Sequence, residues 1–346
     1  MSKLDKYNGM IVSSYFKTVS DFIKFLFVCK KFVDNMEKFH YNPVPLTLRS
    51  ISFFPKIETL CLYTPSDENF GVFSRHPNIL RLLLQKPREF FKVRVLYDFD
   101  YFESLKYPSD KFDYKKLTFT YTDKDRIFKE TTKNVVIPKT VKKLGTESFS
   151  SFYKLERVNI PPNVVFIGES CFKTCYNITT LTLPSNLTEI GAVAFATLES
   201  LKSIIIPKYI TSLKAYTFAD CRELVDVELP EHLEIIEKCC FNKCQKLQNV
   251  IIPNGVSEIG NNAFEGCAMS QISIPTCLKT IEKFTFYGCK NLVEVKGLEC
   301  VITFKTFAFG GHTKLNKVEI DKTAILENDA FGEQINVVRI DSHQFK

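Results

Sequence analysis

The sequence predicts a repeat solenoid in which each 23-residue unit contributes one parallel strand, with short turn or helical segments on the other side. Two columns of identical residues lead to this prediction. Phenylalanine recurs at steps of 23 residues, shortened twice to 22, at Phe149, Phe172, Phe195, Phe218, Phe241, Phe264, Phe286, Phe309 and Phe331. Proline recurs at nearly the same step, at Pro138, Pro161, Pro184, Pro207, Pro230, Pro253 and Pro275. Because one unit cannot bury its apolar residues alone, the units are expected to stack into one continuous core.

The strand of each unit is expected just before its proline. In the second unit, Val158 and Ile160 alternate with Arg157 and Asn159, and this period of two predicts apolar side chains inward and polar ones outward. Proline has no N–H to donate to a strand ladder, so it suits the end of the strand. The V-x-x-I step that follows returns the chain, and the A-F-x-x-C-x-x-L stretch is expected to be a short helical or turn segment.

A third column explains the stretch SCFKTC and the similar CCFNKC, which pair two cysteines around a phenylalanine. The second cysteine of each stretch lies three residues after a phenylalanine of the 23-residue column. Phe152 and Leu198 occupy the same position in other units. A slot that accepts Phe and Leu is a core slot, and free cysteine behaves as a small buried hydrophobe. We therefore predict free thiols in a reducing compartment, with no disulfide, no metal site and no cofactor. The cysteines of this column are Cys175, Cys221, Cys244, Cys267 and Cys289.

The repeat frame resembles the BspA-like class of leucine-rich repeats, because the I-P, A-F and C-x-x-L marks recur in phase over about residues 135–340. The resemblance implies a curved right-handed leucine-rich repeat solenoid whose strands line one concave face, and a role in protein or surface recognition without catalytic residues. We assign residues 138–346 to nine such repeats and residues 46–137 to irregular, degenerate leucine-rich repeats. Strands are expected there at Leu60–Leu62, Val93–Tyr97, Lys116–Tyr121 and Asn134–Pro138.

Residues 1–45 are predicted to form a helical cap, with helices between residues 9 and 40 and an N-cap for the second helix at Ser20-Asp21. A cap of this kind would seal the apolar end of the first repeat. The string D-F-I-K-F-L-F-V-C-K-K-F also looks like the second half of an F-box. That resemblance implies a surface for an Skp-type adaptor, formed by Phe22, Leu26, Val28 and Phe32.

Enzymatic chemistry is not indicated by the motifs. None of the five histidines has a metal-ligand partner at helical spacing, and the chain has no phosphate-binding glycine loop and no nucleophile elbow. It also has no run of 18 apolar residues, so no transmembrane segment is expected. The net charge of +7 comes from residues 1–137, which hold 23 Lys and Arg against 16 Asp and Glu. Without a concentrated basic stripe, nucleic acid is not an expected partner.

The outward strand positions of the repeats form the expected binding surface on the concave face. One column consists of Arg157, Thr180, Ser203, Asp226, Asn249, Gln271, Glu294 and Lys317. The next column consists of Asn159, Thr182, Ile205, Glu228, Ile251, Ser273, Lys296 and Glu319. Ile205 and Ile251 are apolar residues that flank Asp226 and Glu228, so this stretch is a candidate hot patch.

Three functions remain open from the sequence. The first is a non-enzymatic scaffold that binds a protein partner through the concave strand face. The second is the substrate-recognition subunit of a cullin-type ubiquitin ligase, and the third is a surface adhesin, for which the sequons at Asn177 and Asn186 would matter. The expected location is the cytoplasm, with the nucleus and a peripheral membrane site as alternatives.

Overall fold

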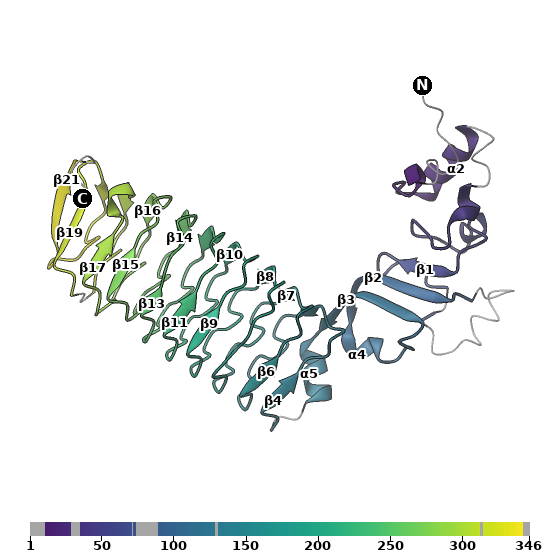
Figure 1. Ribbon diagram of the computed structural model, residues 1–346, viewed down its shortest axis with the longest axis horizontal. Coiled ribbons are helices and arrows are strands. Elements are labelled where there is room, and N and C mark those ends of the chain that lie inside the picture. The colour runs from purple at the N-terminus through teal and green to yellow at the C-terminus, as the bar shows by residue number, and fades with distance from the viewer. Residues whose placement is uncertain are drawn as a thin grey trace. The chain divides into compact units, whose positions relative to one another are not determined.

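Figure 1 shows the computed structural model of the protein. The structure describes residues 11–28, 35–70, 72–73, 89–128, 131–311 and 314–341. The chain divides into two compact units, Met1–Thr118 and Phe119–Lys346, and each is described by itself. The divisions expected after residues 45 and 137 stay a prediction.

The described part of the first unit includes helix α2 (Val19–Val28), the 3-10 helix η2 (Asn35–Lys38) and the 3-10 helix η3 (Ile51–Phe53). The N-cap expected at Ser20-Asp21 is wrong by two residues. The N–H of Thr18 donates to Asp21 Oδ2 at 3.0 Å, and the N–H of Asp21 donates to Thr18 Oγ1 at 3.3 Å. This reciprocal pair is a capping box, which places Thr18 before the helix and Asp21 in its first turn.

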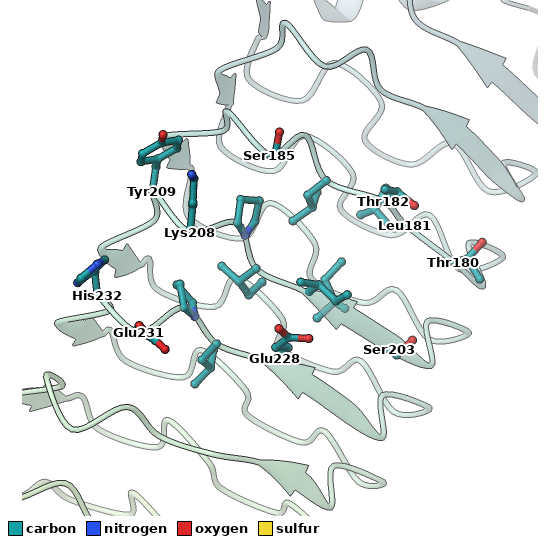
Figure 2. Close-up of a pocket in the computed structure, with 17 residues that line it drawn as sticks. Thr180, Leu181, Thr182, Ser185, Ser203, Lys208, Tyr209, Glu228, Glu231 and His232 are labelled. Carbon is teal, nitrogen blue, oxygen red and sulfur yellow. The ribbon is translucent and has the colours of Figure 1, made fainter.

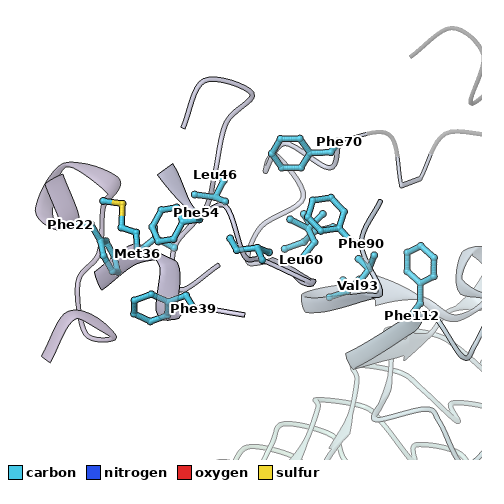
Figure 3. Close-up of a cluster of buried hydrophobic side chains, with 14 residues drawn as sticks. Phe22, Met36, Phe39, Leu46, Phe54, Leu60, Phe70, Phe90, Val93 and Phe112 are labelled. Carbon is cyan, nitrogen blue, oxygen red and sulfur yellow. The ribbon is translucent and has the colours of Figure 1, made fainter. Parts of the chain in front are cut away.

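Three parallel strands complete the first unit: β1 (Thr59–Leu62), β2 (Lys92–Asp100) and β3 (Phe112–Phe119), with the short helix α4 (Tyr101–Ser104) after β2. β1 pairs with β2, and β2 pairs with β3. Strands are therefore present at the three predicted places, but the one expected at Lys116–Tyr121 begins earlier and ends at Phe119, because Thr120 caps the helix that starts at Tyr121. Leu60 and Leu62 of β1 are buried. Figure 3 shows how the ring of Phe22 from α2 lies with Met36, Phe39 and Phe54 in one apolar cluster, which continues through Leu60 to Val93.

The second unit begins with helix α5 (Tyr121–Ile127) and then winds through two series of parallel strands. We call the first series the first ladder. It consists of β4 (Asn134–Val136), β6 (Arg157–Asn159), β9 (Ser203–Ile205), β11 (Asp226–Glu228), β13 (Asn249–Val250), β15 (Gln271–Ser273), β17 (Glu294–Lys296), β19 (Lys317–Asp321) and β21 (Asn336–Ile340). Its pairs are β4–β6, β9–β11–β13, β15–β17 and β19–β21, so the expected parallel solenoid is confirmed.

The second ladder was not expected from the sequence. It is built of two-residue strands: β5 (Lys143–Leu144), β7 (Phe166–Ile167), β8 (Glu189–Ile190), β10 (Ser212–Leu213), β12 (Ile235–Ile236), β14 (Glu258–Ile259), β16 (Thr280–Ile281), β18 (Thr303–Phe304) and β20 (Ile325–Leu326). These strands form where the V-x-x-I step returns the chain. A 3-10 helix, η4 (Leu298–Cys300), interrupts the late repeats, and the described A-F-x-x-C segments are turns rather than helices.

The turn segments bond to one another on a third side of each coil. The N–H groups of Glu147, Phe149 and Ser151 donate to carbonyls of the following coil at 2.8 to 2.9 Å. Their acceptors are the carbonyl oxygens of Glu169, Cys171 and Lys173. Because such buried backbone groups must be paired, these bonds allow the turns to pack closely without helices.

The phenylalanine column forms a continuous stack of rings through the second unit. Neighbouring ring centroids lie 5.0 to 6.0 Å apart, and the planes deviate by at most 25°. The ring of Phe119 extends this stack before Phe149, with the two centroids 5.1 Å apart. Phe119 does not follow the 23-residue step, so the sequence pattern did not reveal it. Each ring is almost fully buried, so the stack fixes the register of one coil on the next.

The cysteine column lies beside the rings, as the sequence predicted, and its thiols also form hydrogen bonds. Cys175 Sγ donates to the carbonyl of Phe149 at 3.1 Å, and Cys244 Sγ donates to that of Phe218 at 3.2 Å. The thiols of Cys221, Cys267 and Cys289 likewise donate to the carbonyl of the stacked phenylalanine in the preceding coil. Burial raises the pKa of the Cys175 thiol to about 12, so it stays protonated and can donate.

Candidate functional site

The candidate site is the outward side of the first ladder, which we call the first-ladder face. On β11, Val227 is buried while Asp226 and Glu228 are exposed, and β6 and β9 repeat this alternation. The pattern follows from the pleat of a strand, in which successive side chains point to opposite sides. The first residues of the three-residue strands therefore form one row of exposed side chains, and the third residues form a second row. Most of these side chains are polar.

All sixteen residues predicted for this face are exposed. Thr180 and Thr182 are among them although their segment is not an assigned strand. The sequence reasoning missed the outer members of the rows, Asn134 and Val136 on β4 and Asn336 and Val338 on β21. The alternation N-V-V-I before Pro138 could have revealed the first pair, and Val136 is 67% exposed.

The central part of the face is hollowed by two adjoining cavities. The first has a volume of about 870 Å³ and extends from Thr180 across β9 to Glu231 and His232 (Figure 2). The second has a volume of about 840 Å³ and extends from Asp226 across β13 to Lys296. Glu228, Leu229 and Glu231 line both cavities, so the two hollows meet at β11.

Two exposed isoleucines stand on either side of β11 in this hollow region. Ile205 on β9 pairs in register with Glu228, and it is 64% exposed. Ile251 follows β13 directly and is 84% exposed. The predicted hot patch therefore coincides with the hollows, which the sequence did not predict.

The carboxylates of β11 differ from the other charges of the face in their partners. Glu294 lies 3.5 Å from Lys296, and Lys317 lies 2.6 Å from Glu319, so these strands neutralise their own charges. Asp226 Oδ1 accepts a hydrogen bond from Asn249 Nδ2 at 2.5 Å, which leaves its charge in place. In the described part of the chain, no cation forms an ion pair with Asp226 or Glu228. The negative charge is thus concentrated at β11, where the hollows meet, whereas Lys208 lines the first hollow and Lys296 the second.

The residues predicted to bind an adaptor have different environments. Phe22 is fully buried in the first unit, where its ring contacts Phe39 and Phe54 edge-on. The side chain of Phe22 is therefore not accessible to an adaptor in this structure, and the adaptor-binding site stays a prediction. Val28 is 71% exposed, and its neighbour Phe27, which the prediction omitted, is 86% exposed. The side chain of Leu26 and the whole of Phe32 lie outside the described residues.

The described residues hold no group of three or more His, Cys, Asp or Glu side chains placed to share a metal ion. Their helices are all too short or too polar to cross a lipid bilayer.

The chain is similar to known proteins over its repeats. The model of the BspA type leucine rich repeat region matches in six copies, over residues 124–230 and 211–338. No curated protein matches the chain. A leucine-rich repeat protein from Bacteroides ovatus is similar at 25% identity, covering 60% of this chain and 74% of its own, with a TM-score of 0.38.

Two further solved structures are similar to parts of the chain. The T. pallidum leucine rich repeat protein shares 27% identity over 54% of this chain and 78% of its own, with a TM-score of 0.38. A leucine rich cell surface protein from Faecalibacterium prausnitzii shares 18% identity over 65% of this chain and 83% of its own, with a TM-score of 0.39. Since the repeat model itself matches more than half of the chain, the protein belongs to the BspA type leucine-rich repeat family.

Proposed function

We propose that the protein is a non-enzymatic interaction scaffold that binds a protein partner through the first-ladder face. The observation that carries this proposal is the pair of hollows that meet at β11, with Ile205 exposed in the first hollow and Ile251 in the second. Single exposed apolar residues are common, but two beside a shared hollow and a local charge form a patch that a partner can cover.

The hollows also fit a protein ligand better than a reacting small molecule. Their linings combine apolar strand ends such as Ile206 and Leu229 with hydroxyls and carboxylates that project from separate coils. Such an extended mixture of apolar centre and polar surroundings is typical of protein interfaces. The family's repeat architecture supports the same use, because a stack of coils offers one long continuous surface.

Replacing Ile205 by aspartate should weaken partner binding by about tenfold or more, because buried apolar anchors carry much of the affinity of an interface. The matched control is Ile302→Asp, since Ile302 is 54% exposed and immediately precedes β18 of the second ladder. The measurement is quantitative mass spectrometry of proteins captured from native lysate by the full chain and by both variants. A partner that requires Ile205 and not Ile302 supports the first-ladder face.

Equal loss of partners with both variants, or no loss with either, would show that binding uses another surface. Circular dichroism of each variant separates a lost contact from a lost fold. Both substitutions are at exposed positions, so both variants should keep the spectrum of the unaltered chain.

A ubiquitin-ligase subunit is the second candidate, and the exposed pair Phe27 and Val28 favours it. These two apolar side chains lie at the end of α2 and do not belong to the buried cluster around Phe22. We expect Val28→Asp to abolish co-purification of an Skp-type adaptor, whereas Leu48→Asp, at a residue that is 50% exposed in the same unit, should not. If no adaptor co-purifies with the unaltered chain, the ligase hypothesis fails.

A further inference from the structure

Three side chains form a straight row across the first ladder: Ile205 on β9, Glu228 on β11 and Ile251 after β13. Glu228 pairs with Ile205 in the strand register, and Val227 pairs with Val250, which places Ile251 opposite Glu228 on the other side. Neighbouring strands lie about 4.8 Å apart, so the two isoleucines are separated by about 9.6 Å with the carboxylate midway.

Within the described residues, the carboxylate of Glu228 in the middle of this row has no cation paired with it. Asp226, beside it on β11, already accepts the amide of Asn249. Lys296 at the far side of the second hollow is held by Glu294 at 3.5 Å, and the ammonium of Lys208 lies over the ring of Tyr209, 4.8 Å from its centroid. Glu231 lines both hollows with Glu228, so the negative charge is concentrated at their junction.

We propose that the partner presents an amphipathic helix, which lies across the strands with apolar residues at i and i+7 on Ile205 and Ile251. A lysine or arginine at i+3 or i+4 pairs with Glu228. This inference rests on the proposed function, since it specifies the kind of segment that the first-ladder face receives.

The spacing of the row selects a helix over an extended segment. A helix rises about 1.5 Å per residue, so positions i and i+7 lie about 10.5 Å apart on one face, close to the separation of the isoleucines. An extended segment repeats its side chains on one face every two residues, about 6.6 Å, and reaches about 13 Å at its third such residue. A helix therefore matches both the separation of the two isoleucines and the shorter step from each isoleucine to Glu228, and a β-strand matches neither.

The backbone of the first ladder also argues against an added strand. The N–H of Ile206 donates to the carbonyl of Glu228 at 2.9 Å, and the strands β9, β11 and β13 pair with one another. Strand addition requires the free edge of a sheet, whereas Ile205, Glu228 and Ile251 project from its face. Side chains, rather than backbone groups, must therefore make the contact.

The probe is a displayed library of single-helix peptides with randomised outward positions, selected on the full chain and counter-selected on the chain carrying Ile205→Asp and Ile251→Asp. Enriched peptides should carry apolar residues at i and i+7 and a lysine or arginine between them. One enriched peptide is then synthesised, and its affinity is measured by fluorescence anisotropy.

Glu228→Lys should weaken this peptide by about tenfold, because an attractive charge pair becomes a repulsive one. Glu258→Lys is the matched control, because Glu258 is an exposed carboxylate on β14 of the second ladder. The peptide whose central arginine is replaced by glutamate should bind the Glu228→Lys chain more tightly than it binds the unaltered chain.

The inference is overturned if the selection enriches no peptide over the counter-selection, or only peptides that carry an acidic residue between the two apolar positions. It is also overturned if Glu228→Lys and Glu258→Lys weaken binding equally. The outcome is separate from that of the proposed function: a native partner that depends on Ile205 but not Ile302 keeps the scaffold function even when the helix inference fails.

Discussion

Replacing Phe241 by alanine should lower the free energy of unfolding by about 3–5 kcal/mol, because the ring leaves a cavity that its coil cannot close. Phe241 is fully buried, and its ring lies 5.4 Å from that of Phe218 and 5.3 Å from that of Phe264. The substitution therefore removes contacts with the coils on both sides. Urea unfolding followed by circular dichroism measures the loss.

Two control variants separate packing from general damage. Phe241→Leu keeps most of the volume and should cost less than about 1.5 kcal/mol. Phe331→Ala removes the last described ring of the stack, which is stacked only on Phe309, at 5.3 Å, and meets Phe304 at a tilt, at 4.9 Å. It should cost less than Phe241→Ala, because no further coil stacks on it. If both alanine variants lower the free energy of unfolding equally, the stability of the solenoid is not a sum of contacts between neighbouring coils.

The sequence was sufficient to predict the ring stack and the inward and outward sides of the first ladder. Both depend only on periodicity: a residue that recurs every 23 positions occupies the same place in every coil, and alternation along a strand assigns its side. The prediction of Cys175 as a core residue succeeded for the same reason, because Phe152 and Leu198 occupy its slot. Its thiol hydrogen bond to Phe149 was missed, since it needs the distance between two coils.

The remaining features depend on how closely neighbouring coils approach, which no single residue type reveals. Val193 adopts a positive φ of 61° and Thr197 one of 59°, although β-branched residues disfavour that region. Each coil imposes this conformation through its bonds to the next: the N–H of Val193 donates to Ala215, and that of Thr197 donates to Ala219. The hollows around Glu228 were equally hidden, because their depth is set by side chains from three coils.

The position four residues before each stacked phenylalanine is often glycine, and it shows how closely neighbouring coils approach. Lys214 and Glu237 replace glycine at this position in other units, so the position does not require a positive φ. Gly168 and Gly191 indeed lack a positive φ, but they have no room for a side chain. Where Glu237 stands instead, its carboxylate accepts the N–H of Ala215 at 3.0 Å, an arrangement that a shorter side chain cannot make.

Gly191→Ala should therefore destabilise the chain by about 1–3 kcal/mol, the range typical of overpacking in a close-packed interior. A methyl group there would collide with the amide of Glu169 and lie 2.6 Å from the carbonyl carbon of Gly168. Both are backbone atoms of the preceding coil, so a side-chain rotation cannot relieve the collision. The two coils would have to separate, which would strain the bond from the Gly191 N–H to the carbonyl of Ile167, now 2.8 Å long.

Gly255→Ala is the matched control, because its methyl group would lie 3.4 Å from the nearest atom, the carbonyl oxygen of Leu233. Without a collision, alanine there restricts the unfolded chain and should change stability between zero and a gain of about 1 kcal/mol. Thermal unfolding of both variants tests the comparison. If Gly191→Ala is as harmless as Gly255→Ala, the coils can separate at little cost. The first-ladder face would then adapt its spacing to a partner, and the match between 4.8 Å strands and a helix would lose its selective force.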